Sequence, residues 1–220
     1  MKKFNVLLLA LGLLLLGGCA TTQQHFDYST YKRLNPKSIL VLPPLNNTTD
    51  IAATYSVMST ISAPIAEAGY YVYPVAVVAE TFKENGLQNA GEIHQVPLAK
   101  LQQIFGNDAV LYITVERYGA VYQVIQSNVI VTVHANLVDA RTGVSLWKGA
   151  ASASSAEREG NNGGGLVGIL VNAAIKQMIH SIGDSGYPIA RIASDRLLTP
   201  TKGGGLLYGP RSPLFGTDQK

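Results

Sequence analysis

An apolar run near the amino terminus constrains this chain most, because it decides which residues take part in folding at all. Lys2 and Lys3 precede about eleven residues, Val6 to Leu16, that are apolar except for Gly12. A helix that crosses a bilayer needs roughly 20 apolar residues, so this run is too short for one. A basic start followed by a short apolar segment is typical of a secretory signal peptide. We therefore expect residues 1–18 to be removed before the mature chain folds.

The residues that end this run are more specific than an ordinary cleavage site. Leu16-Gly17-Gly18-Cys19 resembles the lipobox of bacterial lipoproteins. The resemblance implies that the Cys19 thiol receives a diacylglycerol, that the signal is cut just before it, and that the new amino terminus is acylated. Three acyl chains, at roughly 0.8 kcal/mol per buried methylene, anchor a protein stably where one chain binds only marginally.

The residue after the cysteine bears on the membrane that would hold the protein. Ala20 is not the aspartate that retains many Gram-negative lipoproteins in the inner membrane. The resemblance therefore implies an anchor in the outer membrane, facing the periplasm. It leaves open whether the protein reaches the cell surface.

Composition excludes several classes of protein. The chain is 47% hydrophobic and has one cysteine, which is enough apolar material for a core and rules out an internal disulfide. Without Lys2 and Lys3 the 17 Lys and Arg fall to 15, against 14 Asp and Glu. Proteins that bind nucleic acid concentrate basic residues on one face, and these are scattered. We expect no nucleic-acid partner.

Breaker residues divide the mature chain into three parts. Residues 19–36 are polar and aromatic by turns without a sustained period, which predicts a lipidated tether. Residues 200–220 are rich in Gly and Pro, which predicts a flexible tail without regular elements. Residues 37–199 have the length of one compact domain.

The first half of the domain reads as one buried strand followed by helices. Ser38–Leu42 is continuously apolar, as in a strand buried on both faces. A helix is expected before Gly69, with Asp50 or Thr49 as its N-cap and with Pro64 bending or dividing it. Its apolar stripe comprises Ile51, Tyr55, Met58, Ile61 and Ile65. Shorter elements are a strand at Tyr70–Tyr73 and helices at Val75–Asn85 and Leu98–Phe105.

The second half is richer in strands. Strands are expected at Ala109–Arg117, Val121–Ile125, Val129–Val138 and Val144–Ala151. The last pairs back through a hairpin turn in which Gly143 takes a positive φ. Leu166–Ile182, after a flexible spacer at Gly160–Gly165, predicts a core helix, and Ile189–Leu198 predicts a short one. The whole predicts a single α/β domain, a mixed β-sheet with helices packed on its faces.

Two short motifs suggest chemistry without the surroundings that the chemistry needs. Gly183-Asp184-Ser185-Gly186 matches the residues around the nucleophile of trypsin-like proteases, but a glycine-ended helix explains it better. Gly163-x-Gly165-x-x-Gly168 fits the dinucleotide fingerprint, but no strand precedes it directly, so a hinge loop is the better interpretation. We expect no cofactor and no catalytic residue, with a hydrolase using Ser185 kept as an unfavoured alternative.

Histidines and aromatic residues give weaker signals. His25, His94, His134 and His180 show no metal-ligand spacing, so we expect no metal, and His134 is expected to be solvated. Tyr112, Tyr118 and Tyr122 cluster around one strand connection, where core packing and a partner surface are both open. The same holds for the apolar residues of the tail, Leu206-Leu207-Tyr208 and Leu214-Phe215, which either dock on a neighbour or belong to a disordered end.

Cys19 and two further segments together carry a family resemblance. The segments are Ile39-Leu40-Val41-Leu42-Pro43-Pro44-Leu45-Asn46-Asn47-Thr48 and Asp139-Ala140-Arg141-Thr142-Gly143, the latter continuing to Leu146-Trp147. The mature chain resembles a family of small Gram-negative lipoproteins of unassigned function, encoded beside a lipoprotein similar to the curli-secretion pore. The resemblance implies a fold similar to the amino-terminal domain of TolB, without the propeller that follows it there.

Anchor, composition and resemblance together favour a binding protein. We expect a lipid-anchored, non-enzymatic accessory or assembly protein of an outer-membrane secretion or envelope complex. Its partner would be an envelope lipoprotein or a pore, and self-association stays open. The alternative is a subunit of a pore like the curli-secretion channel, which requires long alternating strands arranged in a ring.

Overall fold

A short apolar strand, β1 (Ser38–Val41), lies inside the sheet of the computed structural model, which describes residues 27–122, 127–158, 185–200 and 205–217. β1 pairs in parallel with β3 (Tyr71–Val72) on one side and with β4 (Ala109–Tyr122) on the other. Ile39 and Val41 enter one hydrophobic core, while Leu40 and the following Leu42 enter a second. Successive side chains of a strand point to opposite faces. The predicted strand buried on both faces is confirmed.

A long antiparallel meander completes the sheet. β4 pairs with β5 (Ser127–Asp139), and β5 pairs with β6 (Ser145–Ser154), giving the order β3-β1-β4-β5-β6. The short β2 (Leu45–Asn46) also pairs in parallel with β4. Residues 121 and 122 of the strand predicted at 121–125 continue the strand predicted at 109–117, with a register shift between Val115 and Arg117, and residues 123–125 lie outside the described residues. The predicted hairpin turn forms, with Gly143 at φ 72°.

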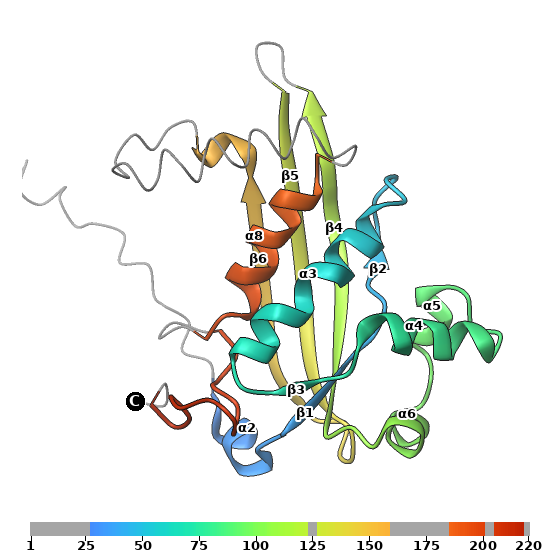
Figure 1. The fold of residues 1–220 in the computed structure, drawn as a ribbon, viewed down its shortest axis with the longest axis vertical. Helices are drawn as coiled ribbons and strands as arrows, with labels where there is room; N and C mark the ends of the chain where they lie inside the picture. Colours follow the sequence, from blue (N-terminus) through green and yellow to red (C-terminus); the bar gives the residue numbers. More distant parts are fainter. Residues whose placement is uncertain (1–26, 123–126, 159–184, 201–204, 218–220) are drawn as a thin grey trace, which may run out of the picture.

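Two helices cover one face of this sheet. α3 (Ala53–Glu67) and α8 (Tyr187–Leu198) lie side by side across it (Figure 1), and Thr60 and Ser194 share a buried hydrogen bond of 2.8 Å between them. The stripe predicted for α3 is wrong at its start, because Ile51 is 89% and Tyr55 69% exposed. At the start of α3, the small residues Ala53 and Ser56 take the buried side. Small side chains let two helices approach closely. Pro64 stands in the last turn and does not divide the helix.

Among the described residues, helices cover the second face only on its β1 side. α4 (Val75–Glu84), α5 (Ala90–Ile93) and α6 (Leu98–Phe105) place Val78, Phe82, Ile93 and Leu101 against Leu40, Leu42 and Val110. Farther along the same face, His134, Lys148 and Ala150 are exposed. The single α/β domain with a mixed sheet and packed helices is therefore confirmed, and the helices of the described ranges leave part of one sheet face open.

The segments expected as tether and tail belong largely to the domain. Residues Ser29–Leu34 form helix α2, and Tyr31 is 2% exposed. In the tail, Leu206 and Leu207 are 1% and 5% exposed, and they pack into the same core as α3 and α8. No helix or strand forms in residues 205–217, as predicted, but residues 205–207 are buried, so this part of the tail is held on the domain. Backbone bonds explain this, since Gly209 N–H donates to Ala68 O at 2.7 Å and Arg211 N–H to Gly69 O at 3.1 Å.

Several predicted segments lie outside the described residues. These are the signal peptide, Cys19, the glycine spacer and the apolar helix predicted at Leu166–Ile182. Within the described ranges, β6 is followed by a 3₁₀ turn at Ser155–Arg158. No helix of these ranges is both long and apolar enough to cross a membrane.

The close approach of the tail to residue 69 gives a stability prediction with a built-in control. Gly69 has φ +97°, and a Cβ added there would lie 2.4 Å from the Ser212 backbone nitrogen. Gly86 has φ +82° with nothing within 4 Å. Both Gly→Ala changes strain the backbone, by about 1–2 kcal/mol. Gly69→Ala should cost about 1–3 kcal/mol more, because the tail must move.

Urea unfolding of the two variants measures this difference. Equal losses of unfolding free energy would show that the segment after Gly205 does not press on residue 69.

Candidate functional site

A groove of about 570 Å³ lies between α3, α4 and α5. Its apolar lining includes Pro43 from the end of β1, Met58 from α3, and Leu87 and Ile93 from the α4–α5 region. Ile51 and Tyr55 stand at its mouth, 89% and 69% exposed. We refer to this feature as the helix groove. It combines a partly buried floor with two large apolar side chains that the fold leaves in solvent.

A polar loop holds the mouth of the helix groove in place. Asn46 Nδ2 donates to Asp50 O at 2.8 Å, and Thr48 Oγ1 donates to Asn46 Oδ1 at 2.8 Å. Asp50 Oδ1 accepts from Ala52 N–H at 2.9 Å, just before α3 begins. The N-cap of α3 is Ala52, without a side-chain cap bond, so the prediction of Asp50 or Thr49 as the N-cap is wrong, and Asp50 instead orders the loop just before it. Ile51 lies between these bonded residues, so its exposure is built into the loop.

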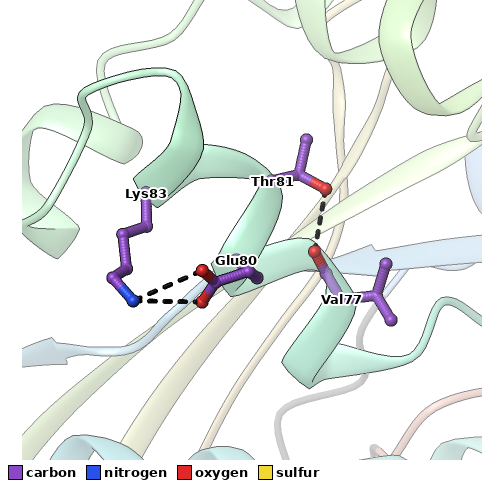
Figure 2. A network of polar contacts seen from close by, with 4 residues as sticks. All are labelled: Val77, Glu80, Thr81 and Lys83. Carbon is purple, nitrogen blue, oxygen red and sulfur yellow. Dashed lines mark hydrogen bonds and ion pairs between the residues drawn. The ribbon is translucent and has the colours of Figure 1, made fainter.

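The rim formed by α4 is charged. Figure 2 shows Lys83 turned toward Glu80, with its Nζ 3.3 Å from the carboxylate, and Thr81 Oγ1 donating to Val77 O at 2.8 Å. The two charged side chains are 65% and 56% exposed, and exposed pairs of this kind add little stability. Their place beside an apolar floor resembles the polar rim of a protein interface. Val77, on the same helix, is 61% exposed.

A histidine fastens α5 to the floor of the helix groove. His94 Nε2 lies 2.9 Å from Pro43 O, and the His94 ring meets the Tyr112 ring edge-on, with centroids 5.3 Å apart. Burial lowers the pKa of His94, and the bond to the Pro43 carbonyl opposes this shift in part. Burial also raises the pKa of Tyr112. Both shifts favour the neutral side chains, so this contact is a neutral packing contact at neutral pH.

The open part of the sheet forms a second, shallower hollow of about 530 Å³. Tyr112, Thr114, His134, Asn136 and Lys148 line it. Asn136 Oδ1 accepts from Ser145 Oγ at 2.6 Å, and His134 is exposed, as the sequence predicts. Polar and small side chains alternating on one face are typical of an antiparallel sheet that faces water. The helix groove is therefore the stronger candidate site.

The residues that the sequence singled out are not brought together. Ser185 lies in the turn before α8, and within the described ranges no hydrogen bond joins it to a histidine. Its neighbour Gly186 is needed for packing, because a Cβ there would lie 2.4 Å from Cζ of Tyr118. No group of three or more potential metal ligands occurs in the part of the chain that the structure describes. Gly163 to Gly168, His25 and His180 lie outside that part.

The tyrosine cluster is divided by the irregularity in β4. Tyr112 packs against the second core, whereas Tyr118 packs against the core under α3 and α8. Residues six apart on a regular strand share a face, but the register shift between Val115 and Arg117 reverses the alternation. Core packing explains both residues. The side chain of Tyr122 lies outside the part of the chain that the structure describes.

Comparisons with known proteins agree on one family. The family model described as "Putative lipoprotein GNA1162-like" matches residues 26–211. The chain is 51% identical over 186 residues to "Putative lipoprotein NMB1124/NMB1162" of Neisseria meningitidis serogroup B, covering 84% of this chain and 86% of the relative. The crystal structure of lipoprotein GNA1162 from Neisseria meningitidis is also similar, at 51% identity and a TM-score of 0.53, covering 66% of this chain and 99% of that one.

The His94 contact predicts how stability changes with pH. Because the folded-state pKa of His94 lies below 6.5, the unfolded chain binds more protons just below that pH. The free energy of unfolding should therefore fall as the pH drops from 6.5 toward the folded-state pKa. His94→Gln, which can still donate to Pro43 O, should flatten this part of the profile in urea titrations between pH 5.5 and 7.5.

His134→Gln is the matched control, because it also removes an imidazole, but an exposed one. If the fall in unfolding free energy below pH 6.5 persists in His94→Gln and disappears in His134→Gln, His94 is not the group that causes it.

Proposed function

The chain belongs to the GNA1162-like lipoprotein family, and from this premise we propose that it is a lipid-anchored, non-enzymatic accessory or assembly protein of an outer-membrane secretion or envelope complex. Its partner is an envelope lipoprotein or a pore, which it binds through the helix groove. Cys19 carries the lipid, and Ala20 directs the protein to the outer membrane, facing the periplasm. The tether from Cys19 to the first described residue, Asp27, is about eight residues long.

One observation carries this proposal, the exposure of Ile51 and Tyr55 at 89% and 69% beside an apolar floor. Single exposed apolar residues are common, but large ones at the mouth of a groove with a charged rim are typical of sites where another protein docks. The bonds from Asn46, Thr48 and Asp50 order this mouth in advance. Because this loop is already ordered, it loses little conformational entropy when a partner binds.

A protein ligand fits the groove better than a reaction does. A hydrolytic site needs a nucleophile within hydrogen-bond reach of a base. Here the His94 ring is bonded to Pro43 O, whereas Ser185 lies in the turn before α8, a helix that packs on the core under α3. Apolar lining residues with a Lys83–Glu80 rim suit an amphipathic segment of a protein partner.

Photo-crosslinking in living cells tests the proposal. Benzoyl-phenylalanine placed at Tyr55 should give a discrete adduct with an envelope lipoprotein or pore, whereas the same residue at Ala150 on the open sheet face should not. Ile51→Asp should lower the adduct yield by at least about tenfold, the change expected of an interface residue worth about 1.4 kcal/mol. Ile104→Asp, at an exposed position on α6, is the matched control and should leave it unchanged.

Three outcomes would overturn parts of the proposal. If the crosslinker at residue 55 yields no adduct, or if only the crosslinker at residue 150 yields one, the helix groove is not the binding site. Rings in electron micrographs of detergent-extracted protein would replace the accessory role by that of a pore subunit. An intact mass without acyl chains on Cys19 would remove the anchor.

A further inference from the structure

We propose that one end of the domain rests on the membrane surface, with lipid headgroups as its ligand. The surface is the anchor end, which we define by six exposed side chains: Lys32, Arg33, Lys37, Arg211, Leu214 and Phe215. The inference rests on the proposed acylation of Cys19, because the lipid brings this end to the bilayer. It adds an orientation and a second membrane contact, which the lipid alone does not provide.

Hydrogen bonds from tyrosine side chains bring the two ends of the described chain together at this place. Tyr28 Oη donates to Gly205 O at 2.7 Å, and Tyr70 Oη donates to Leu207 O at 2.7 Å. The hydroxyls of Tyr31 and Tyr70 are 2.8 Å apart. α2 and the C-terminal segment therefore lie beside each other, at the end of the sheet opposite the β4–β5 hairpin (Figure 1).

The length of the tether limits which surface can meet the bilayer. Seven residues lie between Cys19 and Asp27, so the eight steps of an extended chain, at most ~3.6 Å each, cover about 29 Å in all. β4 has 14 residues, which at ~3.4 Å each span about 45 Å. It starts at Ala109, paired with Ile39 soon after α2, and runs toward the hairpin. The anchor end is thus within reach of the lipid, and the far end of the upright hairpin is not.

Two apolar side chains stand out from this end. Leu206 and Leu207 enter the core, but Leu214 and Phe215 are 47% and 45% exposed. They are ordered by the turn that carries them, since Phe215 N–H donates to Ser212 O at 3.1 Å and Thr217 N–H to Leu214 O at 3.0 Å. Leu206 and Leu207 therefore belong to the hydrophobic core, whereas Leu214 and Phe215 do not.

The charges of the anchor end suit phosphate groups. Lys32, Arg33, Lys37 and Arg211 are exposed, and the Arg211 guanidinium lies 5.3 Å from the Tyr71 ring centroid. Two carboxylates on these segments accept backbone hydrogen bonds: Asp27 Oδ1 from Ser29 N–H, and Asp108 Oδ2 from Lys37 and Ser38 N–H. Basic residues beside aromatic and apolar ones are typical of surfaces that meet a membrane interface.

Site-directed fluorescence on the full lipidated chain tests this surface. Cys19 is the chain's one cysteine, so once it is acylated an environment-sensitive dye reacts only with an introduced thiol. Pro213→Cys places the dye beside Leu214 and Phe215, and Ala120→Cys places it near the hairpin end. In vesicles of phosphatidylethanolamine and phosphatidylglycerol that carry spin-labelled lipid, the dye at 213 should be quenched several-fold more than the dye at 120.

Charge variants give the second readout. Arg211→Glu should reduce quenching at 213 several-fold, whereas Arg117→Glu, at an exposed position toward the hairpin, should not. Equal quenching at 213 and 120, or a dye at 213 that responds only when envelope proteins are added, would overturn the inference. The intact mass of the same sample separates this inference from the proposed lipid anchor. If the protein is acylated and the dye at residue 213 is not quenched, the membrane contact of the anchor end is wrong and the lipid anchor stands. If the protein is not acylated, both are wrong.

Discussion

The contact between the C-terminal segment and the loop after α3 gives this molecule two different ends. Gly209 N–H reaches Ala68 O at 2.7 Å, and no side chain fits between the two glycines at 69 and 209. This contact carries Leu206 and Leu207 into the core and places the C-terminal segment beside α2. The two ends of the described chain, α2 and the C-terminal segment, therefore lie at one end of the domain, and the β4–β5 hairpin lies at the other (Figure 1).

The mouth of the helix groove lies toward the hairpin end of β4. Asp50, which orders its mouth, lies near Gly119 in the second half of β4, where a Cβ would be 3.5 Å from Asp50 Oδ2. A lipid at Cys19 would hold one pole at the bilayer, leaving Ile51 and Tyr55 free to meet a partner. Anchoring and partner binding can then occur at once, since they use different surfaces of one rigid sheet.

Residues with strong local patterns were predictable from the sequence, and residues placed by long-range contacts were not. The apolar run in β1, the turn at Gly143 and the helix at Leu98–Phe105 form as expected, because alternation, turn chemistry and periodicity act locally. The exposure of Ile51 was missed, because the buried side of α3 includes the polar residues Ser56 and Thr60, and Thr60 bonds to Ser194, 134 residues away. The ordered tail was missed for the same reason, since glycines that break helices also permit the close approach at Gly69.

Neutron reflectometry of the full lipidated protein on a supported bilayer tests the central claim most directly, because it measures how far the protein extends from the membrane. A domain held at its anchor end should form a layer at least about 45 Å thick along the bilayer normal, the length of β4 upright. A layer of about half that thickness would mean that the domain lies on its side. The account of two separate poles would then be wrong.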